Sequence, residues 1–137
     1  MSAKPVAVLD ADIVLARLEQ GHRVHGRATN LFSRVADGNL EAFISAVNFA
    51  EVQAHSLEYR RLSGLNVISF LAASKISIHA PGVEVAERVA DMAGESRLSL
   101  ADRFAAATAE FLSARLYTTD AGLARAMTRR RVPVTRL

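Results

Sequence analysis

Two aspartates follow a short apolar run near the N-terminus of the chain. The run Val6-Ala7-Val8-Leu9 leads directly into Asp10-Ala11-Asp12. Burying carboxylates is costly without a compensating charge, so such a pair favours a bound divalent cation or a basic substrate. Three further acids have similarly apolar neighbours in the sequence: Glu51, Asp102 and Asp120. Carboxylate oxygens brought together are typical ligands of Mg²⁺ or Mn²⁺, which favours a metal site built from these residues.

The elements that must position these acids alternate between strand-like and helical patterns. Helices are expected near 11–19, 23–37, 45–61, 65–74, 83–93, 99–114 and 121–129, and strands near 5–9, 42–44, 76–78, 116–118 and 132–134. This alternation predicts an α/β fold with three layers, α/β/α, around a central parallel sheet of about four to five strands. The last strand contains Pro133, which favours an edge position. We find no repeat or linker, so residues 1–137 are expected to form a single domain.

The acids occupy equivalent places relative to the expected strands. Asp10 and Asp120 each follow a strand directly, Glu51 lies in the helix after the strand at 42–44, and Asp102 lies in the first turn of the helix at 99–114. Ligands of open parallel sheets bind beyond the carboxyl ends of the strands. The sequence therefore predicts that all four acids line one rim of the sheet.

Each acid also has a structural alternative. Asp10 and Asp12 have the positions of a helix cap and a first-turn acid, and Asp120 has that of a cap for the helix at 121–129. Ser99 and Asp102 have the spacing of a capping box. Glu51 could face solvent on an amphipathic helix. Four unrelated caps at one rim are a less economical explanation than one shared site.

Composition narrows the possible partners. The net charge is +3, and among the 17 basic residues only Lys4 and Lys75 are lysine. Arginine is well suited to bidentate phosphate contacts, and Arg129-Arg130-Arg131 lies close to Arg125 and Arg136. This basic segment is compatible with RNA, with an acidic protein or simply with solubility. The chain has no cysteine, no apolar stretch of membrane-spanning length and no signal-peptide pattern, so we expect a cytoplasmic protein without membrane contact.

Four segments in order resemble the PIN-domain ribonucleases, above all the VapC toxins of bacterial toxin–antitoxin pairs. They are VLDAD, NFAEV, LSLADRFAAATA and YTTDAGLARA. The resemblance implies a Mg²⁺- or Mn²⁺-dependent endoribonuclease that is neutralised by a cognate antitoxin and forms homodimers. It also implies one or two metal ions held by Asp10, Glu51, Asp102 and Asp120, with Thr118 or Thr119 orienting metal-bound water. Asp12 departs from this pattern, since many relatives have a small hydroxyl residue or asparagine there.

Two other functions remain open from the residues alone. Asp10-Ala11-Asp12-Ile13-Val14 also fits the first motif of haloacid-dehalogenase-type phosphohydrolases, in which Asp10 would be the nucleophile. That chemistry needs a downstream lysine, and only Lys75 is available. A non-enzymatic receiver-like binding module would need an acceptor aspartate after the third strand and a lysine after the fifth. Neither is found in the sequence.

Overall fold

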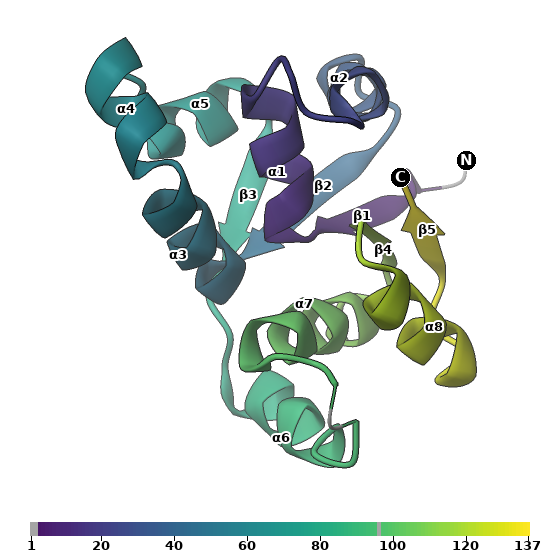
Figure 1. The fold of residues 1–137 in the computed structure, drawn as a ribbon. Coiled ribbons are helices and arrows are strands. Elements are labelled where there is room, and N and C mark those ends of the chain that lie inside the picture. Colours follow the sequence, from purple (N-terminus) through teal and green to yellow (C-terminus); the bar gives the residue numbers. More distant parts are fainter. Residues whose placement is uncertain (1–2, 96) are drawn as a thin grey trace.

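A single sheet of parallel strands forms the centre of the molecule in a computed structural model that describes residues 3–95 and 97–137. The spatial order of the strands is β3-β2-β1-β4-β5 (Figure 1). They are β1 (Val6–Leu9), β2 (Glu41–Ser45), β3 (Ile76–His79), β4 (Arg115–Thr118) and β5 (Val134–Arg136). The central β1 is apolar along its whole length, as is typical of a parallel strand covered on both faces.

Helices cover both faces of this sheet, which confirms the three-layer architecture (Figure 1). One face carries α1 (Ala11–Leu18), α2 (His25–Ala36), α3 (Ala46–His55), α4 (Leu57–Ser63) and α5 (Val67–Ala73), and the other carries α6 (Val83–Asp91), α7 (Leu100–Phe111) and α8 (Ala121–Arg129). Successive residues of β1 face opposite layers, since Ala7 and Leu9 join the core under α1 and Val8 joins the core under α7. The alternation explains why β1 must be apolar throughout.

The chain reverses its direction of travel across the sheet beside β1. It passes from β1 to β2 and β3 on one side, and then crosses to β4 and β5 on the other. The boundary between β1 and β4 is therefore the topological switch point, where parallel sheets leave a crevice for ligands. At this boundary the backbone N–H of Asp10 donates to the carbonyl of Tyr117 over 3.0 Å. The first carboxylate of the sequence motif thus lies at the switch point.

Two expected elements differ in the structure. The helix expected at 45–61 is divided at Ser56, whose backbone leaves the helical region and whose hydroxyl donates to the Val52 carbonyl. Such a bond from a serine to the preceding turn competes with helix continuation. The last strand is Val134–Arg136, and not 132–134, because Pro133 has no N–H for the ladder and Arg131 turns the chain with a φ of 59°. The edge position expected for this strand is confirmed.

The length and polarity of the helices bear on whether any of them could cross a membrane. Within residues 3–95 and 97–137, none combines the length and the apolar character needed to cross a membrane.

Candidate active site

Asp10 lies at the carboxyl end of β1 and is almost entirely buried, with 3% of its surface exposed. One carboxylate oxygen accepts the backbone N–H of Ala11 over 2.9 Å, which caps α1. The other accepts the hydroxyl of Thr118 over 2.8 Å, from the end of the neighbouring β4. The capping role suggested by the sequence is therefore real, but it uses only one of the two oxygens. The second oxygen joins the two strands across the switch point.

The environment of Asp10 disfavours its charged form. Burial is the main cause that raises the pKa of Asp10 from its ordinary value of 3.8 to about 7, and the nearby charges of Asp12 and Asp102 contribute to the rise. The hydrogen bonds from Thr118 and Ala11 act in the opposite direction but do not compensate. A buried carboxylate with a strongly raised pKa is typical of a functional site. A bound cation would reverse the effect, because it stabilises the ionised form.

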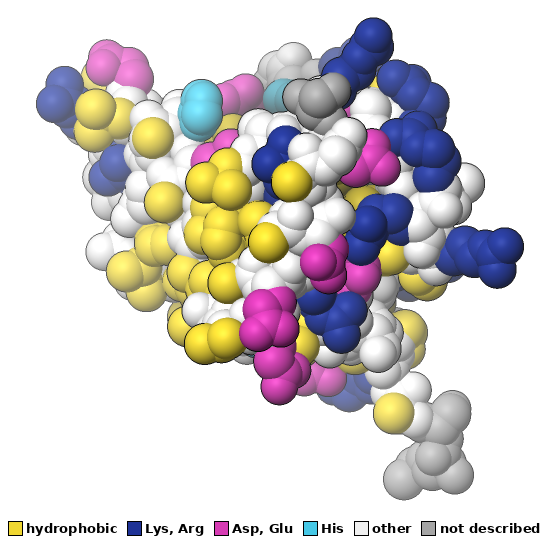
Figure 2. All heavy atoms as spheres, turned by 90° about the horizontal axis from the view of Figure 1, so that it is seen from below, with side chains coloured by type: hydrophobic (Ala, Val, Ile, Leu, Met, Phe, Trp, Pro, Cys, Tyr) yellow, Lys and Arg dark blue, Asp and Glu magenta, His cyan; other side chains and the backbone are white. Residues whose placement is uncertain are grey.

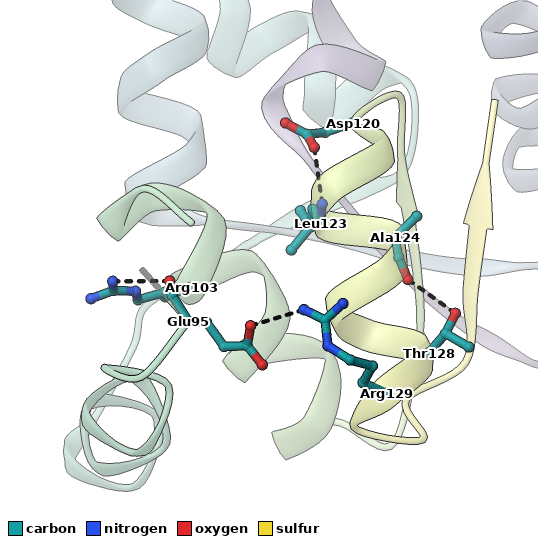
Figure 3. A network of polar contacts seen from close by, with 7 residues as sticks. All are labelled: Glu95, Arg103, Asp120, Leu123, Ala124, Thr128 and Arg129. Atoms are coloured by element: carbon teal, nitrogen blue, oxygen red, sulfur yellow. Dashed lines mark hydrogen bonds and ion pairs between the residues drawn. The ribbon is translucent and has the colours of Figure 1, made fainter. Parts of the chain in front are cut away.

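The two threonines after β4 connect three of the acids. The Thr118 hydroxyl donates to Asp10 and also accepts the backbone N–H of Asp120 over 3.0 Å. The Thr119 hydroxyl donates to a carboxylate oxygen of Asp12 over 2.8 Å. Asp120 caps α8 by accepting the N–H of Leu123 over 2.9 Å (Figure 3). One short segment of chain therefore fixes the positions of acids from β1, α1 and β4.

Asp102 approaches the same place from the other layer. It forms a capping box with Ser99 at the start of α7, in which each side chain bonds to the backbone of the other residue. Burial raises the pKa of Asp102, and the charges of Asp120 and Asp12 add to that rise, while the bonds from Ser99 lower it. The cap predicted from the sequence is confirmed. The cap is not its only interaction, because Asp102 also interacts electrostatically with Asp10, Asp12 and Asp120.

Glu51 is not among the acids whose charges act on Asp10 or Asp102, and it is linked to the start of α7 through a residue that the sequence did not single out. Asn48 is fully buried on α3, and its side-chain amide donates to Glu51 and to the backbone carbonyl of Ala101, each over 3.1 Å. Ala101 precedes Asp102, so Asn48 ties α3 to the first turn of α7. A buried asparagine three residues before a glutamate, between valine and phenylalanine, is the signal that could have revealed it.

This bridge allows a test on stability. Asn48→Ala removes both side-chain hydrogen bonds and is expected to lower the free energy of unfolding by about 1–3 kcal/mol, the usual cost of leaving buried polar partners unpaired. Urea unfolding followed by circular dichroism measures the difference. Asn30→Ala, at an exposed position of α2, is the matched control and should unfold like the natural protein. Equal unfolding of the two variants would show that Asn48 does not join the two helices.

The donor set fits a hard divalent cation in its chemistry. Asp10, Asp12, Asp102 and Asp120 interact electrostatically at the end of the sheet, and all supply carboxylate oxygens. The side-chain oxygen of Asn48 is buried without a partner in the described chain, so one more hard oxygen is available nearby. In residues 3–95 and 97–137, however, no three acidic or histidine side chains are close enough to form a ready-made metal centre. The acids are gathered but do not form a closed coordination shell.

The phosphohydrolase alternative is not supported by this geometry. Lys75 precedes β3 and therefore lies at the amino edge of the sheet, opposite to Asp10. Its ammonium group donates to the carbonyl of Ala36 over 3.1 Å. The receiver-like alternative is not supported either, because Ala80-Pro81-Gly82 follows β3 where an acceptor aspartate would be needed.

The fold and this site define a PIN domain. The family model described as "PIN domain" matches residues 7–127, and the chain belongs to this family. A search of curated protein sequences gave no match.

Solved structures share the fold at low sequence identity. A toxin–antitoxin complex from Klebsiella pneumoniae matches with a TM-score of 0.62 and 24% identity over 83% of this chain and 86% of that one. VapC20 of Mycobacterium tuberculosis, a toxin that cleaves the Sarcin-Ricin loop, matches with a TM-score of 0.67 and 16% identity over 88% and 94%. VapBC2 of Rickettsia felis, bound to a DNA fragment from its promoter, matches with a TM-score of 0.70 and 15% identity over 96% and 98%. The PIN fold expected from the motifs is thereby confirmed.

Proposed function

We propose that this chain is a single-domain, metal-dependent endoribonuclease of the VapC type, the toxin of a toxin–antitoxin pair. The observation that carries the proposal is the junction of Asp10, Thr118 and Asp120 at the switch point of a PIN domain, with Asp102 facing it from α7. The charges of Asp12 and Asp102 disfavour ionisation of Asp10, and a divalent cation would relieve this repulsion. A polyanionic substrate would otherwise be repelled by the same charges.

The acids have distinct proposed roles. Asp10, Asp102 and Asp120 would hold Mg²⁺ or Mn²⁺, and Glu51 would act as a further ligand or orient the attacking water. When bound, such an ion polarises a phosphoryl oxygen and lowers the pKa of water, which supplies hydroxide at neutral pH. Thr118 keeps the Asp10 carboxylate turned toward β4. Thr119 does the same for Asp12, which we assign a secondary role at the rim.

RNA is the substrate that this chemistry and the family favour. The fold is shared with a toxin named for cleavage of the Sarcin-Ricin loop. In loops and single strands the bases are unstacked and the phosphodiester is accessible, whereas a regular RNA duplex hides its base edges. We therefore expect hydrolysis within single-stranded or looped RNA.

The proposed partners follow from the same relatives. One matched structure is a toxin–antitoxin complex from Klebsiella pneumoniae, and another is VapBC2 from Rickettsia felis bound to a DNA fragment from its promoter. We infer that an antitoxin neutralises this protein in the cytoplasm and that the protein pairs as a homodimer. Large apolar side chains on the surface, such as Leu62 and Val83, leave area for such contacts. A gene for a small DNA-binding protein immediately upstream would support the pairing.

The deciding experiment is an RNA cleavage assay with the purified protein. Total RNA should be cut into discrete fragments in Mg²⁺ or Mn²⁺ and remain intact with a chelator. Restoring the metal after chelation should restore cleavage, because the carboxylates need a cation to accept the substrate. Cleavage that persists in the chelator would indicate a contaminating nuclease. Intact RNA under all metal conditions would contradict the proposal.

A further inference from the structure

Arginines line a surface that begins beside the candidate active site and continues along α8. One groove of about 420 Å³ contains Arg125, Arg129 and Arg136, together with Ala121, which follows Asp120 directly. A second groove of about 260 Å³ contains Arg97 and again Arg125 and Arg129. The two shared arginines thus stand between the grooves. We define the four arginines Arg97, Arg125, Arg129 and Arg136 as the α8 arginine surface.

This surface lies next to the acids at two places, on β5 and on α8. Arg136 is paired in register with Thr118 at the end of β5, and its Nε donates to the carbonyl of Thr119 over 3.4 Å. On α8, a Cβ added at Gly122 would lie 3.2 Å from the Asp120 carboxylate and 4.0 Å from the Arg125 guanidinium. Asp120 and Arg125 are therefore close neighbours where the group of acids ends, although they form no ion pair in the described residues.

The charge of the surface is only partly neutralised. Arg129 pairs with Glu95 over 2.9 Å, as Figure 3 shows. Arg125 and Arg136 are exposed and form no ion pair in the described residues. Figure 2 shows basic side chains gathered on the side of this face that α8 occupies, whereas hydrophobic side chains dominate the other side. The surface is therefore a source of positive potential beside the group of acids at the end of the sheet.

We propose that the α8 arginine surface binds the backbone of the RNA strand next to the scissile phosphodiester. This inference rests on the proposed function and adds where the substrate runs. An RNA strand held at the switch point must continue past it, and α8 begins directly after Asp120 at this end of the sheet. Arg125 and Arg129 are one helical repeat apart, about 6 Å along the axis, and so present two guanidinium groups on one flank. Guanidinium groups bind phosphates without reading bases, so these contacts position any sequence.

Direct binding tests the inference independently of cleavage. A fluorescent 12-nucleotide single-stranded RNA is titrated in Ca²⁺, a hard cation that carboxylates bind and that offsets their repulsion of RNA. The natural protein is compared with Arg125→Gln/Arg129→Gln over a range of salt concentrations, and a gel checks that the RNA stays intact. The affinity of the variant should be lower by at least about tenfold, and the slope of log affinity against log salt should fall by about 1.4, because two phosphate contacts are lost. Arg27→Gln/Arg34→Gln removes the same charge from exposed positions of α2 and should bind like the natural protein.

Two further titrations refine this test. The first distinguishes arginines that contact phosphates from arginines that only support the fold, and the second distinguishes an RNA ligand from an acidic protein ligand. Arg125→Lys/Arg129→Lys keeps the charge and should retain most of the affinity, while equal loss in this variant would indicate a structural role and overturn the proposal. Unchanged RNA binding by the glutamine variant, or no RNA binding by the natural protein, would also overturn it. Loss of binding to a polyglutamate peptide with RNA binding intact would assign the surface to an acidic protein instead. Because these titrations measure binding and not cleavage, their outcome is independent of the outcome of the nuclease assay.

Discussion

Asp10→Asn is expected to reduce metal-dependent RNA cleavage by more than about 100-fold while the protein stays folded. Even outer partners of metal ligands are worth about 10–100-fold, and Asp10 is the most deeply buried acid of the group. Asparagine preserves the shape of the side chain and is a good helix cap, so α1 should begin at the same residue. The rate of cleavage of a defined RNA in saturating Mg²⁺ or Mn²⁺ measures the effect.

The control for this experiment removes a carboxylate elsewhere. Asp37→Asn, at the exposed end of α2, changes the net charge by the same amount and should cleave at the natural rate. Circular dichroism should show equal helix content in both variants. Full activity of Asp10→Asn would remove Asp10 from the proposed metal site and with it the main support for a nuclease.

The metal-free protein should lose stability as the pH rises toward and through 7. The pKa of Asp10 is about 7 in the folded protein, compared with an ordinary value of 3.8. The folded state therefore prefers the protonated carboxyl, so this contribution to stability is complete below about pH 4 and is lost as Asp10 ionises. Between pH 5 and pH 8 the contribution should fall by about 2–3 kcal/mol. The raised pKa of Asp102 acts in the same direction.

Comparison with Asp10→Asn isolates the contribution of this carboxyl from all other titrations. Urea unfolding at pH 5 and pH 8 in chelator gives the free energy of unfolding of both proteins. The natural protein should lose about 2–3 kcal/mol more than the variant over this interval, because asparagine does not ionise. Adding Mg²⁺ or Mn²⁺ at pH 8 should stabilise the natural protein much more than the variant. If the free energy of unfolding changed with pH equally in the two proteins, the pKa of Asp10 would not be raised by folding.

The sequence by itself determined the layers of the fold and the order of the acids along it. Apolar strands such as Val6–Leu9 alternate with amphipathic helices, and this local periodicity depends only on which faces must be buried. Helix starts were also readable, because Ser45, Ser99 and Asp120 are capping residues that act within their own turn. Boundaries were less certain where several weak signals compete, as at Ser56 and Pro133.

Only the tertiary structure decided what those acids and their neighbours do together. The switch point depends on the strand order, which places Asp10 beside Thr118 although they are 108 residues apart. The burial that raises the pKa of Asp10 exists only once the elements have packed, and no local pattern encodes it. Asn48 and Arg136 gained their positions in the same way, through contacts with α7 and β4. Spacing in the sequence identifies groups that share an element, whereas their distances across the sheet arise only when the elements pack.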